Sequence, residues 1–191
     1  MEQTTGGISL DQLVTSIADA LAEVDNAKRP YREFQPGVGP YGEPQLVKLI
    51  AASLSRRLRT SAVTKRTPDL LIPQHWAVEF KIARPYGDNG KEAENWSVNL
   101  LHPYPGNVST IGDCYKLANW NGPERRAAVV IGYEHTPARV DLEPLIRSFE
   151  VVAREVARVK ISNRVEVSRA GLIHPVDQCV KVFAWEVFEH S

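Results

Sequence analysis

Two short apolar segments that carry charged residues constrain this chain most. Residues 67–72 read TPDLLI and residues 76–81 read WAVEFK, and only three residues separate them. Such a pattern predicts an antiparallel β-hairpin. Side chains alternate along a strand, so Glu79 and Lys81 should leave one face while Asp69 of the neighbouring strand reaches the same face. The sequence therefore predicts two carboxylates and an ammonium group gathered on one side of a hairpin.

This cluster suits a hard divalent cation. Two converging carboxylates offer the oxygen ligands that Mg²⁺ prefers, and Lys81 would then hold or polarise an attacking water. Two structural interpretations stay open. Asp69 and Glu79 are also consistent with charges that protect an exposed strand edge from aggregation. Lys81 is also consistent with a simple ion pair to Glu79.

The spacing of these residues resembles the signature of the PD-(D/E)XK nuclease superfamily. Pro68-Asp69 is followed, after nine residues, by Glu79-Phe80-Lys81. The resemblance implies an α/β fold with a restriction-endonuclease-like core, in which a mixed central β-sheet is flanked by helices. It also implies Mg²⁺-dependent cleavage of DNA, with Mn²⁺ as a substitute metal. Asp69, Glu79 and the backbone carbonyl of Phe80 would hold the metal.

Two further residues follow from the resemblance. Glu43 opens the helix expected before the hairpin, and in this superfamily that helix often carries an acidic residue that points into the metal site. The alternative is that Glu43 only complements the helix dipole. Lys116 lies on a later helix that approaches the active site in related nucleases. The alternative for Lys116 is a local ion pair with Asp113, three residues before it.

Basic residues precede the hairpin and form a candidate surface for DNA phosphates. No acidic residue interrupts the segment from 56 to 66. The same arginines would also complement the carboxyl end of the helix that begins at Glu43, so a solvated helix end is the alternative. The candidate DNA-binding residues are Arg56, Arg57, Arg59, Lys65, Arg66 and Lys116.

Apolar periodicity and turn residues predict the remaining elements. Helices are expected at 10–26, 43–58, 110–120 and 142–159, with Ser9 and Asp141 as N-caps. Strands are expected at 69–72, 76–83, 127–133, 165–173 and 180–188. Residues 96–101 are expected as a third strand of the meander, after a surface loop at 84–95. Alternatively, 84–109 is a binding loop whose aromatic residues stack on single-stranded nucleic acid.

Composition agrees with one domain over residues 1–191, whose nuclease core spans about 43–133. The chain is 43% hydrophobic, and its 23 basic and 23 acidic residues give zero formal net charge. DNA affinity must therefore come from a local patch. Two distant cysteines argue against a disulfide framework, and no apolar stretch is long enough for a membrane span. A cytoplasmic protein without a membrane partner is expected.

Several functions are compatible with these features. The expected one is a bacterial type II restriction-type endonuclease that acts as a homodimer, each subunit cutting one strand. A repair or defence nuclease without strict sequence specificity carries the same motif. A catalytically silent relative that binds nucleic acid, and a small-molecule Mg²⁺ enzyme with the long loop as a lid, are the remaining alternatives. No recognition helix or base-reading pattern predicts a target sequence.

Overall fold

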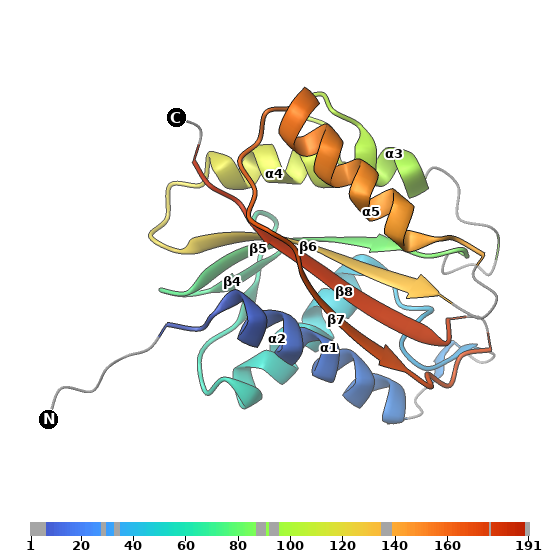
Figure 1. Ribbon diagram of the computed structural model, residues 1–191. Coiled ribbons are helices and arrows are strands. Elements are labelled where there is room, and N and C mark those ends of the chain that lie inside the picture. The colour runs from blue at the N-terminus through green and yellow to red at the C-terminus, as the bar shows by residue number, and fades with distance from the viewer. Residues whose placement is uncertain are drawn as a thin grey trace, which may run out of the picture.

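The fold has three layers, with one β-sheet between two layers of helices (Figure 1). The computed structural model describes residues 7–27, 30–32, 35–86, 91, 96–134, 139–175 and 177–189. This architecture confirms the predicted mixed central sheet flanked by helices.

The sheet has six strands, and its central pair determines its mixed character. Strands β5 and β6 run parallel, whereas every other neighbouring pair in the sheet is antiparallel. A separate two-stranded ribbon forms from β1 (Pro30–Arg32) and β2 (Gln35–Pro36). In spatial order the six strands are β3 (Val63–Thr64), β4 (Leu70–Ile72), β5 (Trp76–Ala83), β6 (Arg125–Glu134), β8 (Cys179–Glu186) and β7 (Val165–Ala170).

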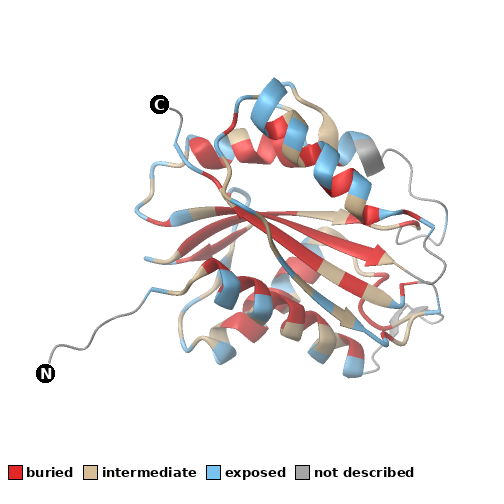
Figure 2. Cartoon of the chain, viewed as in Figure 1, coloured by how far each residue is buried: buried red, intermediate tan, exposed pale blue. Residues whose placement is uncertain are grey.

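Helices cover the two faces of the sheet and bury a separate core on each (Figure 2). One layer contains α1 (Leu10–Asn26) and α2 (Glu43–Arg57). The other layer contains α3 (Trp96–Leu101), α4 (Thr110–Ala118) and α5 (Leu142–Val151), which a π-helical turn at Val152–Val156 extends. Each strand of the sheet therefore offers two different environments to its alternating side chains.

Local signals located most elements correctly. Ser9 and Gln12 form the reciprocal capping box at the start of α1, and Asp141 caps α5. The hairpin, the helix that begins at Glu43 and the three later strands are confirmed. The long helix expected at 142–159 ends its α-helical part at Val151. Most of the loop expected at 84–95 lies outside the described residues.

The strand predicted at 96–101 is wrong, because these residues form helix α3. The sheet has no place for them beside the hairpin. The outer edge of β4 pairs with β3, an unpredicted strand at Val63–Thr64, and the other edge of β5 pairs with β6. The meander is therefore β3-β4-β5, and its third strand comes before the motif and not after it.

Within the described residues, no helix combines the length and the apolar character that a membrane crossing requires.

Candidate active site

The β4–β5 hairpin brings the two motif carboxylates together. Leu70 pairs with Val78, so the next positions of the two strands place Asp69 opposite Glu79. Oδ2 of Asp69 accepts a hydrogen bond of 2.8 Å from the backbone N–H of Phe80. This bond fixes the Asp69 carboxylate at the segment that carries Glu79, Phe80 and Lys81.

Strand alternation determines which face of the sheet each β5 side chain reaches. Val78 and Phe80 pack into the core beneath α1 and α2. Ala77 and Ala83 pack into the core on the α4 side of the sheet. Glu79 lies two positions from Ala77 and four from Ala83, so its side chain points to the same face of the sheet, toward α4.

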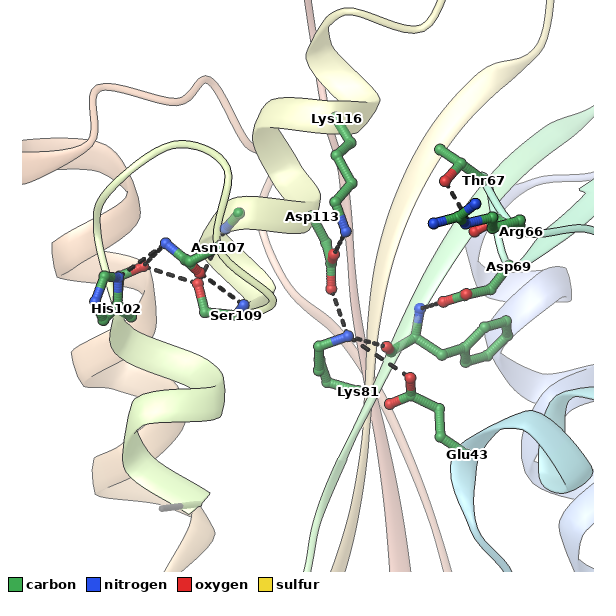
Figure 3. A network of polar contacts seen from close by, with 12 residues as sticks. Glu43, Arg66, Thr67, Asp69, Lys81, His102, Asn107, Ser109, Asp113 and Lys116 are labelled. Atoms are coloured by element: carbon green, nitrogen blue, oxygen red, sulfur yellow. Dashed lines mark hydrogen bonds and ion pairs between the residues drawn. The ribbon is translucent and has the colours of Figure 1, made fainter.

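Lys81 lies at the centre of the polar network (Figure 3). Its side chain is 14% exposed, and Nζ lies 2.7 Å from Oδ2 of Asp113 and 3.7 Å from Oε1 of Glu43. Nζ also donates a 3.0 Å hydrogen bond to the backbone oxygen of Phe80. Burial disfavours the ammonium form, but the carboxylates of Glu43 and Asp113 outweigh it, so the pKa of Lys81 is raised. Lys81 therefore carries its positive charge throughout the neutral range.

Asp113 is the residue of this network that sequence analysis did not nominate. It belongs to the first turn of α4 and is 1% exposed. Its two carboxylate oxygens bridge two lysines, with Lys81 at 2.7 Å and Lys116 at 2.6 Å. The only sequence signal was its spacing from Lys116, which indicated a surface ion pair and gave no reason to link α4 to β5.

The start of α4 is fixed by a second polar network, which determines where Asp113 lies (Figure 3). Ser109 caps the helix by accepting a hydrogen bond from the N–H of Gly112, and its hydroxyl donates to the backbone oxygen of His102. Oδ1 of Asn107 accepts from the N–H of Ser109, and its amide nitrogen contacts the His102 ring. The segment from His102 to Ser109 therefore holds the helix that delivers Asp113.

Glu79 is a buried carboxylate surrounded by other carboxylates. It is 4% exposed, and its Oε1 has no hydrogen-bond partner among the described residues. Burial, followed by the charge and hydrogen bonding of Asp69 and the charge of Asp113, raises the pKa of Glu79 to about 9. Without an added positive charge, Glu79 is therefore protonated at neutral pH.

Glu43 approaches from the opposite helical layer. It occupies the first turn of α2, where Gly42 is the N-cap, and its side chain is about one-third exposed. Burial raises the pKa of Glu43 to about 7, although the charge of Lys81 opposes this rise. Glu43 is thus the second carboxylate, after Asp113, that lies beside Lys81, and its role toward a metal stays a prediction.

Arg84 connects β5 to the segment that leads into α2. Its guanidinium donates hydrogen bonds of 2.5 Å to the oxygen of Gly39 and 2.9 Å to the oxygen of Tyr41. These two carbonyls come shortly before Glu43 in the chain. Arg84 therefore ties the strand that carries Lys81 to the backbone that presents Glu43.

Lys116 and Lys81 contact the same residue, Asp113. Lys116 contacts Asp113 rather than a motif residue, and its side chain is 39% exposed. Its charge opposes the rise in the pKa of Glu79. The predicted approach of this helix position to the site and the alternative ion pair with Asp113 are therefore both present.

The structure does not bring Arg56 and Arg57 to the site. Arg56 pairs with Glu23 of α1 at 2.8 Å, and Arg57 pairs with Glu23 at 3.3 Å and Asp19 at 3.6 Å. These arginines lie at the carboxyl end of α2, roughly 20 Å along the helix from Glu43, since each residue advances the helix by about 1.5 Å. Their ion pairs connect α1 to α2.

Of the remaining basic residues predicted to bind DNA, Lys65 and Arg66 lie beside the carboxylate cluster, whereas Arg59 does not. Arg59 is exposed just beyond the end of α2, with a positive φ of 50°. Lys65 and Arg66 are exposed and border a cavity of about 520 Å³ that reaches the two carboxylates Glu43 and Asp69. The residues around this cavity are Glu43, Pro44, Val47, Lys48, Thr64, Lys65, Arg66 and Asp69.

No family model matches the chain, and no curated protein or solved structure matches it either.

The donor atoms of the cluster fit a hard cation, although they are not assembled around one. Among the described residues, no three His, Cys, Asp or Glu side chains form a group that could hold a metal ion. Asp69, Glu79 and the Phe80 carbonyl nevertheless supply only oxygen donors, and Oε1 of Glu79 is buried with no hydrogen-bond partner in the described part of the chain. The Phe80 carbonyl already accepts a 3.0 Å hydrogen bond from the Lys81 ammonium, and its second lone pair could coordinate the metal.

Replacing Asp113 tests whether the bridge between the lysines matters for chemistry. Asp113→Asn removes the charge that faces Lys81 and Lys116. If the cluster cuts DNA, as the resemblance implies, we expect cleavage to fall by about 10–100-fold, the range typical for residues that orient catalytic groups. The pKa of Lys81 should fall as well, which would move the alkaline limit of the pH–rate profile to lower pH. An unchanged profile with full activity would contradict a positioning role for Asp113.

Proposed function

We propose that this protein is a Mg²⁺-dependent DNA endonuclease with a restriction-endonuclease-like core. The observation that supports this most is the convergence of Asp69, Glu79 and Lys81, where a buried carboxylate oxygen of Glu79 has no partner among the described residues. Burying an unpaired acid costs stability, so its presence at this position favours a functional role.

The metal would be held by Asp69, Glu79 and the Phe80 carbonyl, with Glu43 as a further carboxylate. When bound, Mg²⁺ or Mn²⁺ polarises the phosphate and lowers the pKa of a coordinated water. Glu79 and Glu43 must lose their protons before all of their oxygens can coordinate, which couples metal affinity to pH. We therefore expect metal binding to strengthen as the pH rises through neutrality.

Lys81 performs the remaining chemistry in this proposal. Its charge is maintained by Asp113 and Glu43, and its Nζ already points to the Phe80 carbonyl. An ammonium there can orient the attacking water, stabilise the resulting hydroxide and oppose the negative charge that develops on the phosphate. Asp113 contributes by holding Lys81 in place.

The substrate and assembly follow from the same resemblance. DNA is the expected substrate, and a homodimer of the bacterial type II restriction kind would cut both strands of a site. A repair or defence nuclease without strict sequence specificity uses the same catalytic residues. Cytoplasmic localisation belongs to this proposal.

A plasmid assay tests the proposal directly. Purified protein is incubated with supercoiled plasmid and with phage genomic DNA, in Mg²⁺ or in EDTA, alongside Asp69→Ala. Discrete fragments that require both Mg²⁺ and Asp69 would indicate a sequence-specific endonuclease. A smear or nicked circles with the same requirements would indicate the repair or defence type. Cleavage that persists in Asp69→Ala would refute the assignment, and binding without any cleavage would favour a silent DNA-binding protein.

A further inference from the structure

The cavity between α2 and the turn before β4 adjoins the catalytic cluster and is basic. We propose that it is a subsite for the DNA backbone phosphate next to the one that is cut, bound by Lys48, Lys65 and Arg66. This inference rests on the proposed nuclease function and extends it to a defined contact with substrate.

Helix α2 forms one wall of the cavity. Pro44, Val47 and Lys48 occupy positions i, i+3 and i+4, so they share one face of the helix. Glu43 lies in the first turn, directly before Pro44 and one turn before Val47, and its carboxylate is 3.7 Å from the Lys81 ammonium. The wall that presents Lys48 is therefore continuous with the catalytic cluster.

The turn between β3 and β4 forms the opposite wall. A backbone hydrogen bond of 3.1 Å from the N–H of Lys65 to the oxygen of Asp69 closes this turn. The β3–β4 pairing of Thr64 with Leu70 anchors its two ends. Lys65 and Arg66 are consequently held in the same turn as a motif carboxylate, as Figure 3 illustrates for Arg66 and Asp69.

The three cations around the cavity differ from the arginines at the far end of α2. Arg56 and Arg57 are already neutralised by acids of α1. Lys48, Lys65 and Arg66 are exposed, and none of them forms an ion pair with an acidic side chain in the described part of the chain. The cavity lining also includes Glu43 and Asp69, but neither forms an ion pair with these three cations in the described part of the chain, so the cationic side of the cavity favours an anionic ligand.

The position of the cavity beside Glu43 and Asp69 favours an anion that belongs to a polynucleotide. A volume of about 520 Å³ is in the range of ligand-sized pockets. The carboxylates Glu43 and Asp69 lie at its border, where the scissile phosphate and its metal would be. The scissile phosphate would then lie beside the carboxylates and the metal. The adjacent phosphate of the same strand would lie beside the three cations. Lys48 was not part of the basic cluster identified from sequence.

A comparison of two substrates tests the subsite. The triple variant Lys48→Ala, Lys65→Ala, Arg66→Ala is assayed on DNA and on bis(p-nitrophenyl) phosphate with Mn²⁺, since this small diester has no neighbouring phosphate. We expect kcat/KM for DNA to fall at least about tenfold more than kcat/KM for the small diester. DNA binding, measured in EDTA by fluorescence anisotropy, should weaken, with a salt-dependence slope smaller by about one or more.

A charge-matched control separates local contact from net charge. Arg147→Ala, Arg154→Ala, Lys160→Ala removes three exposed cations from α5, its π-helical extension and the segment that follows, and this variant should retain wild-type DNA binding. The subsite would be overturned if the triple variant bound DNA as tightly as wild type and showed the same ratio of kcat/KM for DNA to kcat/KM for the small diester. The nuclease proposal would stay intact in that case, provided that wild type still cuts DNA. Equal losses on both substrates would also overturn it, because the three residues would then act on the catalytic centre. A wild-type protein that neither binds nor cuts DNA would overturn both proposals.

Discussion

Glu79→Gln is expected to produce a protein that is more stable than wild type and has lost DNA cleavage. Burial and neighbouring carboxylates raise the pKa of Glu79 to about 9 in the folded state, whereas the unfolded chain ionises near the ordinary value. The unfolded state thus releases its proton first, and wild-type stability falls as the pH rises from about 4.5 to about 9. A glutamine has no proton to release and avoids this loss.

The stability gain should be largest in the neutral to alkaline range. At pH 7.5 we expect about 2–4 kcal/mol, since each pKa unit corresponds to about 1.4 kcal/mol. Urea unfolding at pH 5.0, 7.5 and 9.0 measures it, and the difference between variant and wild type should grow with pH. Glu124→Gln is a suitable control, because Glu124 is also buried but accepts hydrogen bonds from Trp120 and Gln74.

Cleavage by the same variant should fall by at least about 1,000-fold, equivalent to about 4 kcal/mol of transition-state stabilisation. A stabilised, correctly folded variant that still cuts DNA would show that Glu79 is a structural residue. A destabilised variant would contradict the explanation that burial and neighbouring carboxylates destabilise ionised Glu79, even if activity were lost.

Lys81→Met is expected to lower turnover by about 10²–10³-fold while metal binding remains. The substitution keeps an unbranched side chain but removes the ammonium that contacts Asp113, Glu43 and the Phe80 carbonyl. Loss of one preorganised electrostatic group costs about 10²–10³-fold in kcat. Single-turnover cleavage gives the chemical rate, and Mn²⁺ titration followed by electron paramagnetic resonance gives the metal affinity.

Lys116→Met is the matched comparison for Lys81→Met, because both lysines contact Asp113 but only Lys81 lies on the motif strand. Its rate should fall much less. Equal losses of cleavage rate in the two variants would show that the network as a whole, and not Lys81 alone, supports catalysis. Stronger Mn²⁺ binding in Lys81→Met would indicate that the ammonium competes with the metal for the Phe80 carbonyl.

Local sequence determined the parts of the site that lie close together in the chain. Asp69, Glu79 and Lys81 were predictable because a three-residue connection and strand alternation fix their relative positions. Asp113 was not, because its proximity to Lys81 depends on how α4 packs across β5 and β6. The same limit applies to Arg56, since its partner Glu23 comes from α1, 33 residues earlier.

The failed strand at 96–101 has a related cause. Its apolar residues are compatible with a buried strand or a short helix, and only the pairing of the sheet edges decides between them. Strand β3 takes the edge beside β4 although its two residues carry almost no signal of their own. Val63 and Thr64 are β-branched and favour strands, but two residues are too few to predict one, and their pairing with β4 decides the outcome.

The parallel pairing of β5 with β6 determines when a growing chain can acquire its chemistry. Asp69, Glu79 and Lys81 are synthesised early, but β5 gains its neighbour only after residues 125–134 are made, and β6 in turn pairs with β8 near the carboxyl end. Asp113 is delivered by a helix that packs on this completed pair. If the proposed nuclease function holds, a fragment truncated before β6 would contain every residue of the motif, and we expect it not to cleave DNA because β5 would lack the parallel strand beside it.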